Sequence, residues 1–403
     1  MGYAFTDDDV TFLRSRHGAK ALDIVAALPL DKQTMLSDIA QVRSRYPGHD
    51  AALIETALCR RRGRAKLRAA EEMLFTDDAL QQATATAVAA HRAAEIAGRY
   101  PGAVVHDITC SIGAELMELG ARQGIAGVIG SDLDRVRVAM AAYNTAAVGH
   151  RATLLLADAL TPTSTADVVL ADPARRTGSG RVFRLDQLTP PLLELLTTYA
   201  GRPQAVKCAP GLDYRLLRER FGFSGQVQVV SLDGAVREAC LWTERAGEPT
   251  QRATVLRTAD DGTVDAYEVT DADGDSSAPG EIGEWIVDPD GAVVRAGLVR
   301  NYAARHGLWQ LDPQIAYLTG AAVPAGERGF RVLEVTGTGE RELRKVLAAR
   351  DCGRLEILVR GIDVDPDRLR KRLKLKGSQA LTLVLTRIGR KGVGIVCDEG
   401  RRF

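Results

Sequence analysis

Three short segments place acidic side chains directly after apolar runs of the kind that form buried strands. Asp107 ends VVHD, Asp132 ends GVIGSD, and Asp158 follows ATLLLA. Carboxylates at the ends of successive parallel strands can accept hydrogen bonds from the hydroxyl and amino groups of a nucleoside. We therefore predict that these three residues bind a nucleoside-type cofactor.

The segment after the first of these strands, ITCSIGAE, is a turn of small residues that leads into a helical run. Such a turn lets the backbone approach a ligand closely, because no large side chain blocks the way. We expect Thr109, Cys110 and Gly113 to contribute to the cofactor site. Ser111 stands where a glycine would be usual.

The second acidic segment, SDLD, offers two carboxylates for one role. Asp132 stands at the strand tip, where it would face the cleft and accept from ribose hydroxyls, whereas Asp134 is better placed to cap the next helix. Leu133 would lie beside the same cleft. At the third segment, the Asp158 carboxylate could accept a hydrogen bond from the amine of adenine, and Ala159 offers a backbone N–H donor beside it.

A fourth segment, ADPARR, follows the fourth predicted strand, and we expect its Asp172 to contribute to the cofactor site as well. Asp172 could accept a hydrogen bond from an attacking amine, and Pro173 fixes the turn beside it. Arg175 and Arg176 suit a phosphate, or a base stacked on a guanidinium. One strand later, Lys207 could contact either a substrate phosphate or the Asp172 carboxylate.

The elements that must position these residues follow from the alternation of apolar runs. Residues 99–245 alternate short strands with helices, which predicts an α/β, Rossmann-like parallel sheet. Residues 1–98 are rich in helix-forming residues, and 246–328 suggest a small α+β linking domain. Residues 329–403 show a strand-helix-strand-helix-strand-strand order, typical of a compact α+β domain.

The segments DITCSIG, SDLD, ADAL and ADPARR, in this order and spacing, resemble class I S-adenosylmethionine-dependent methyltransferases. A closer resemblance is to bacterial methyltransferases with a C-terminal THUMP-like domain. It is carried over roughly residues 60 to 403 by LQQATATAVAAHRA, ADPARR, KCAPGLD and LVRGIDVDPDRLRKRLKLKG. The resemblance implies S-adenosylmethionine as cofactor and RNA as substrate. It also implies that Gln82 and Thr84 close over the methionine end of the cofactor.

Cys208 leaves a second mechanism open. In RNA 5-methyluridine methyltransferases, a D-P-P-R motif is followed one strand later by a cysteine that attacks the pyrimidine ring. Cys208 has a comparable place after DPAR, although Lys207 and Ala209 depart from that pattern. We expect direct in-line transfer, with covalent attack by Cys208 as the alternative.

Net charge is only +1, so a nucleic-acid partner must be argued from local clusters. Two clusters stand out, and the predicted RNA-binding residues besides Arg176 are Arg61, Arg64, Arg370, Lys371, Arg372 and Lys374. We predict tRNA or rRNA as partner. Two alternatives stay open: a methyltransferase acting on a protein or small molecule, and a non-catalytic RNA-binding protein with a degenerate cofactor fold.

Cysteine spacing and hydropathy bound the remaining possibilities. The six cysteines are scattered without a metal-ligand spacing, which predicts free thiols and no metal. No apolar run reaches about 18 residues, and the N-terminus lacks a secretory pattern, so we expect no membrane association and a cytoplasmic location. The sequence gives no indication of oligomeric state.

Overall fold

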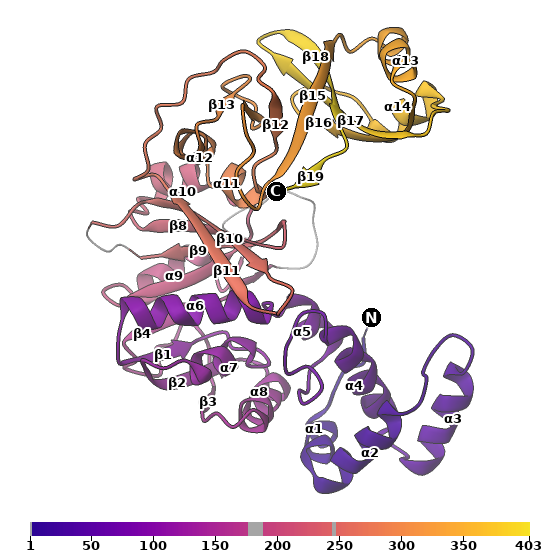
Figure 1. Ribbon diagram of the computed structural model, residues 1–403. Coiled ribbons are helices and arrows are strands. Elements are labelled where there is room, and N and C mark those ends of the chain that lie inside the picture. Colours follow the sequence, from indigo (N-terminus) through magenta and orange to yellow (C-terminus); the bar gives the residue numbers. More distant parts are fainter. Residues whose placement is uncertain (1, 176–187, 244–246) are drawn as a thin grey trace. The chain divides into compact units, whose positions relative to one another are not determined.

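The computed structural model describes residues 2–175, 188–243 and 247–403, and Figure 1 shows the course of the chain. The chain separates into two compact units. The first unit comprises Met1–Gly225 and Glu238–Arg245. The second unit comprises Gln226–Arg237 and Ala246–Phe403. The division into four domains stays a prediction.

Six helices precede the first strand, as the composition of the first 98 residues predicts. They are α1 (Asp7–Arg14), α2 (Arg16–Ala26), α3 (Met35–Arg45), α4 (Asp50–Gly63), α5 (Asp77–Gln82) and α6 (Thr86–Arg99). Thr76 caps α5 by accepting a hydrogen bond from the Ala79 backbone N–H at 3.0 Å. The apolar faces of α1 to α5 pack in one cluster with Ile112, Met117 and Met140, which lie beyond the first strand. This helical region therefore shares its core with the part that follows.

A mainly parallel sheet forms the centre of the first unit. Its strands are β1 (Ala103–Asp107), β2 (Ile125–Asp132), β3 (Thr153–Leu156), β4 (Val168–Ala171), β7 (Gln204–Cys208) and β9 (Ala235–Trp242). Their order is β3-β2-β1-β4-β7-β9; β9 runs antiparallel to β7, and the other neighbours pair in parallel. The helices between them are α7 (Ala114–Ala121), α8 (Arg135–Ala147), α9 (Leu192–Thr198) and α10 (Tyr214–Phe221).

The register of the parallel strands brings their carboxyl ends together. Asp107 at the end of β1 lies opposite Gly130 of β2 and Leu170 of β4, and Asp132 at the end of β2 lies opposite Leu156 of β3. Strand order reverses beside β1, because β2 and β3 continue to one side and β4 and β7 to the other. Ligands of open α/β sheets bind outside the carboxyl ends at such a point.

The second unit begins with β8 (Gln226–Leu232), to which β10 (Gln251–Thr258) pairs in parallel and β11 (Val264–Thr270) is added antiparallel. A separate mixed sheet follows, with strand order β13-β14-β12-β15-β18-β17-β16. The strands and helices from this point to the end of the described chain are β12 (Trp285–Val287), α11 (Gly291–Arg295), α12 (Val299–His306), β13 (Trp309–Gln310), β14 (Leu318–Gly320), β15 (Arg328–Thr336), α13 (Glu340–Ala349), β16 (Cys352–Val359), α14 (Pro366–Leu373), β17 (Gln379–Ile388), β18 (Lys391–Asp398) and β19 (Arg401–Arg402).

The C-terminal part has the predicted strand-helix-strand-helix-strand-strand order from β15 to β18. Its core joins Leu343 and Leu347 of α13 to Leu369 and Leu373 of α14 over the sheet. The leucine stripe of α14 is therefore buried, and its basic residues lie on the opposite, exposed face. No helix in the described ranges is both long and apolar enough to cross a membrane.

Candidate functional site

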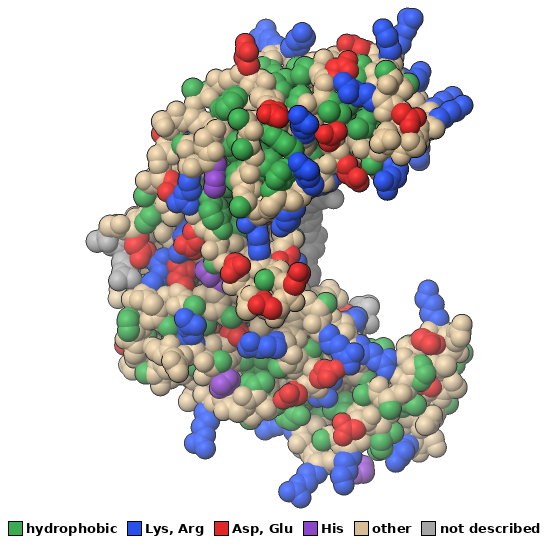
Figure 2. All heavy atoms as spheres, in the orientation of Figure 1, with side chains coloured by type: hydrophobic (Ala, Val, Ile, Leu, Met, Phe, Trp, Pro, Cys, Tyr) green, Lys and Arg blue, Asp and Glu red, His purple; other side chains and the backbone are tan. Residues whose placement is uncertain are grey.

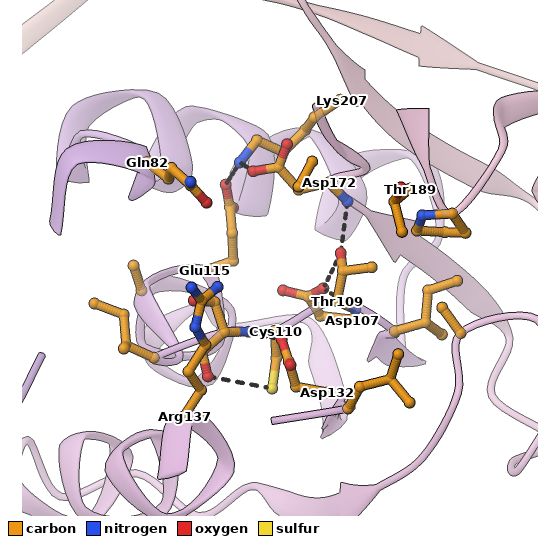
Figure 3. A pocket seen from close by; sticks show the side chains of 18 of the residues that line it. Gln82, Asp107, Thr109, Cys110, Glu115, Asp132, Arg137, Asp172, Thr189 and Lys207 are labelled. Carbon is orange, nitrogen blue, oxygen red and sulfur yellow. Dashed lines mark hydrogen bonds and ion pairs between the residues drawn. The ribbon is translucent and has the colours of Figure 1, made fainter. Parts of the chain in front are cut away.

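A pocket of about 310 Å³ opens at the carboxyl ends of β1, β2, β3 and β4 (Figure 3). Every residue predicted to bind the cofactor, except Gly113, lines it. These residues are Gln82, Thr84, Asp107, Thr109, Cys110, Asp132, Leu133, Asp158, Ala159 and Asp172. The structure therefore brings together side chains that lie up to 90 positions apart in the sequence. Their individual roles stay predictions.

The turn after β1 ties two strand ends together. Thr109 donates its backbone N–H to Asp107 Oδ1 at 3.1 Å, and its hydroxyl accepts from the Asp172 backbone N–H at 2.6 Å. Ser111 has a φ of +47°, in the left-handed region that favours glycine. Gly113 has a φ of +80° before α7, and a Cβ there would lie 3.3 Å from the Ala141 Cα. Gly113 thus acts through its backbone conformation.

The two carboxylates of SDLD take different positions, as the sequence predicts. Asp132 lines the pocket and accepts from the backbone N–H groups of Ser111 at 3.0 Å and Asp134 at 2.9 Å. Asp134 caps α8 by accepting from the Val136 backbone N–H at 2.9 Å. The side chain of Leu133 also lines the pocket and is 68% exposed, so an apolar surface is available to a ring stacked against it.

The third strand end is held by local hydrogen bonds. Asp158 Oδ1 accepts from the Leu160 backbone N–H at 2.8 Å, and the Ala159 carbonyl accepts from the Tyr199 hydroxyl at 2.8 Å. Both residues line the pocket. The hydrogen bond from Leu160 uses only part of the acceptor capacity of the Asp158 carboxylate. Its remaining lone pairs can accept hydrogen bonds from a ligand.

Lys207 of β7 reaches the pocket with a fully buried ammonium. Its Nζ donates to Asp172 Oδ2 at 2.5 Å and to the hydroxyl of Thr84, and it lies 3.4 Å from Glu115 Oε1. Of the two contacts predicted for Lys207, the one to Asp172 is present (Figure 3). Although burial alone would lower it, the carboxylates of Asp172 and Glu115 raise the pKa of Lys207 above its usual value. The lysine is therefore charged.

A buried ion-pair network lies behind this lysine, and the sequence did not point to it. Arg92 of α6 holds Glu115 of α7 with two hydrogen bonds, of 3.2 and 3.3 Å, and Glu238 of β9 with one of 2.5 Å. Burial opposes ionisation of Glu115, but Arg92 and Lys207 lower its pKa to about 2. All three side chains are less than a tenth exposed.

Asp107 has the opposite electrostatic environment. Burial, with the nearby charge of Glu115, raises the pKa of Asp107 to about 7. The hydrogen bond from Thr109 and the charge of Lys207 only partly offset this. Near neutral pH the pocket thus contains a carboxyl group poised between its neutral and ionised forms.

Other predicted catalytic residues are less directly placed. Pro173 is buried and is not among the residues that line the pocket. The backbone of Arg175 pairs with Leu188 in a short ribbon of β5 (Ala174–Arg175) and β6 (Leu188–Thr189), and Arg176 lies outside the described residues. Cys208 does not line the described pocket, and burial raises the pKa of its thiol. This environment disfavours the thiolate that covalent attack would need.

Several lining residues were missed by sequence reasoning. They are Ala83, Ile108, Ser111, Ile112, Ala114, Glu115, Arg137, Ala157, Leu160, Ala174, Thr189, Pro190 and Pro191. Thr189 and the two prolines after it reach the pocket because β6 pairs with β5, which follows Asp172. No local sequence motif predicts this pairing. Arg137 lies three positions after Asp134, the residue that caps α8, and could have been found from the helical geometry of its segment.

None of the predicted RNA-binding residues that the structure describes lines the pocket. Arg61 donates to the backbone carbonyls of Ala26, Leu28 and Pro29, and Arg64 forms an ion pair with Glu71. On α14, Arg370 pairs with Asp367 and Arg372 with Glu340, whereas Lys371 and Lys374 are exposed. Figure 2 shows Lys and Arg side chains projecting from the surface of this C-terminal part at the upper right.

The sheet order and the row of strand-end carboxylates define the class of protein as a class I methyltransferase fold. Residues 327–399 match the THUMP domain-like family. A solved structure from Porphyromonas gingivalis W83, described as a methyltransferase, superposes on this chain with a TM-score of 0.76 at 18% identity. The match covers 98% of this chain and 100% of the Porphyromonas chain. At this identity the likeness shows the fold.

Two strains of Mycobacterium tuberculosis contain a relative that is named as an S-adenosylmethionine-dependent methyltransferase. Each of these relatives is 51% identical to this chain over 356 residues, covering 86% of this chain and 96% of the relative. The chain therefore belongs to this family of S-adenosylmethionine-dependent methyltransferases. The family and enzyme class predicted from the motifs are confirmed.

Proposed function

We propose that this protein transfers the methyl group of S-adenosylmethionine directly to a base of structured RNA, either tRNA or rRNA, in the pocket beside β1 to β4. The observation that carries the proposal is the Lys207–Asp172 pair at the edge of a pocket lined by the strand-end carboxylates. It places a fixed hydrogen-bond acceptor beside a site suited to a nucleoside. The pocket retains all three carboxylates, which argues against a degenerate fold.

The residues present fit the cofactor. Asp132 would hold the ribose hydroxyls, and Leu133 with Ala159 would contact the adenine. Gln82, Thr84 and Asp107 would hold the methionine end. When bound, the cofactor supplies an electrophilic methyl group, and alignment of the reacting atoms provides most of the rate gain in such transfers.

The residues of the chain that act on the substrate are Asp172 and Lys207. The Asp172 side chain is 43% exposed, so an attacking amino group can reach its carboxylate. The Lys207 ammonium donates a hydrogen bond to Oδ2 and fixes the orientation of that carboxylate. Asp172 can then accept a hydrogen bond from the amine and orient its lone pair, without a covalent enzyme intermediate.

RNA is favoured as substrate by the THUMP domain-like match and by the exposed lysines of α14. Lysines that contact phosphates make binding depend strongly on salt. A protein or small-molecule substrate would instead bind with little salt dependence. The buried free cysteines are consistent with a reducing compartment, and we propose a cytoplasmic location.

The first test is calorimetry with S-adenosylmethionine, comparing the wild type with Asp107→Ala, Asp132→Ala and Asp134→Ala. We expect loss of at least about tenfold in affinity for the first two variants, because each removes a pocket carboxylate. Asp134→Ala is the matched control, since Asp134 caps a helix outside the pocket lining. No binding to the wild type, or equal loss in all three variants, would refute the proposed cofactor site.

The second test concerns the substrate. Tritiated S-adenosylmethionine is supplied with tRNA, rRNA or total protein from cells in which the gene has been deleted. Label in an RNA fraction that falls steeply between about 50 and 200 mM salt would support the proposal. Label only in protein, or none in RNA under any salt condition, would contradict it.

A further inference from the structure

Five charged side chains alternate in sign from the interior of the first unit to the pocket. In order they are Glu238, Arg92, Glu115, Lys207 and Asp172. The closest contacts along the series are 2.5 Å, 3.2 Å, 3.4 Å and 2.5 Å. We call these five residues the charge chain. It contains three carboxylates and two cations, so it holds an excess of one negative charge.

The charge chain connects elements that are far apart in the sequence. Arg92 is in α6, Glu115 in α7, Lys207 in β7 and Glu238 in β9, and each of these four side chains is less than a tenth exposed. Only Asp172, after β4, is substantially exposed. Charges buried this deeply are tolerated when each has partners of opposite sign. The charge chain therefore meets the pocket with the exposed carboxylate of Asp172.

Glu115 is the central member of the charge chain and contacts both of its cations. Its Oε1 lies 3.2 Å from an Arg92 Nη2 and 3.4 Å from the Lys207 Nζ, while its Oε2 accepts from the Arg92 Nε at 3.3 Å. The Thr84 hydroxyl also hydrogen-bonds Glu115, and Thr84 in turn accepts from Lys207. Glu115 thus contacts the same lysine ammonium that donates to Asp172.

We propose that Glu115 and Arg92 are positioning residues that hold the Lys207 ammonium against Asp172. In addition, the negative excess of the charge chain makes the pocket prefer the cationic methyl donor to its neutral product. S-Adenosylmethionine carries a positive sulfonium, whereas S-adenosylhomocysteine has an uncharged thioether. The inference rests on the proposed function, since the pocket must bind this cofactor. Its benefit would be release of the product after transfer.

The test is the ratio of dissociation constants for S-adenosylhomocysteine and S-adenosylmethionine, measured by calorimetry. Because the two ligands differ by the methyl group and the charge, the ratio reports the pocket potential and needs no RNA. Glu115→Gln removes a negative charge and should lower the ratio by about tenfold. Lys207→Met removes a positive charge and should raise it by a similar factor. The double variant keeps the original balance and should return to within about twofold of the wild type.

Glu118→Gln is the matched control. Glu118 lies in α7 like Glu115, is also buried, pairs with Arg68 at 3.1 Å and does not line the pocket. It should leave the ratio unchanged. If Glu115→Gln does not fold, Lys207→Met and the double variant still have different expected outcomes, a raised ratio for the first and an unchanged ratio for the second. Equal ratios in wild type, Lys207→Met and the double variant would overturn the proposal, as would shifts of one sign in both single variants.

Positioning is tested separately by methyl transfer to the RNA fraction labelled by the wild type. Glu115→Gln should lower kcat more than it raises KM, and Glu115→Asp, which keeps the charge, should recover part of the loss. A change confined to KM would refute positioning. Failure of the wild type to bind S-adenosylmethionine would refute the proposed function. Binding with a ratio that no charge change alters would refute this inference alone.

Discussion

Replacing Asp107 with asparagine should stabilise the protein and at the same time weaken its binding of the cofactor. The carboxyl is buried, and its pKa is raised to about 7, against 3.8 for an ordinary aspartate. Asparagine resembles the neutral acid and keeps the oxygen that accepts from the Thr109 backbone N–H at 3.1 Å. The variant therefore removes a charge that the fold disfavours without removing the local hydrogen bond.

The sign and size of the effect follow from the two pKa values. Because the pKa is higher in the folded state, folding is favoured by the protonated form, and this stability is lost as pH rises from about 4 through 7. Each pH unit in that window is worth about 1.4 kcal/mol, so the ionised carboxylate costs about 4 kcal/mol above pH 7. The advantage of Asp107→Asn over wild type should grow from about 1.5 kcal/mol at pH 5 to about 4 kcal/mol at pH 8.

Urea unfolding of both proteins at pH 5 and pH 8 measures this difference, with fluorescence and circular dichroism as parallel probes. Calorimetry at pH 7 in buffers of different ionisation enthalpy should show proton release when wild type binds S-adenosylmethionine, and none in the weakly binding variant. A stability difference that does not change with pH, or a wild type that is the more stable at pH 8, would refute the electrostatic reasoning.

Three further predictions concern single features of the chain. Ser111→Gly should raise the free energy of unfolding by about 0.5–1 kcal/mol in urea, because the φ of +47° is strained for serine; a loss of stability would show that the serine side chain matters more than the strain. Cys208→Ala should retain methyl transfer within about twofold, since burial disfavours its thiolate; abolished transfer with normal cofactor binding would restore the covalent mechanism. Replacing Lys371 and Lys374 together with alanine should reduce the salt slope of RNA binding by about two, with cofactor affinity unchanged; an unaltered slope would place the RNA elsewhere.

The strand-end residues were predictable because each follows a continuous apolar run. A run such as VVHD is short, rich in valine and followed by a turn of small residues, which favours a buried strand, and the polar residue that ends it then stands at the sheet edge. Asp107, Asp132 and Asp158 share this pattern, and the register brings them to one pocket. Local capping rules also separated Asp134 from Asp132 correctly.

The charge chain was not predictable by the same means. Arg92 lies 23 positions from Glu115 and 146 from Glu238, so no local spacing relates them. The available signal was the presence of ionisable residues within the otherwise apolar helical runs AVAAHRAAEIA and AELMEL, since such residues are rarely buried without a partner. Arg61 illustrates the reverse case, because a basic cluster in the sequence proves to contain a side chain bonded to backbone carbonyls.

The helices before the sheet contribute directly to the electrostatics of the pocket. Thr84 and Arg92 both precede β1, and each contacts a member of the charge chain that lies beyond it. A chain beginning at residue 99 would lack both, and Glu115 would keep only Lys207 as a cationic partner among its described contacts. Leaving a buried carboxylate without its paired guanidinium costs about 3–5 kcal/mol. The sheet and its strand-end carboxylates are therefore insufficient for this site, because the Asp172 carboxylate is held by Lys207, and Lys207 in turn contacts Thr84 and Glu115, of which the first is supplied and the second is paired by the N-terminal region.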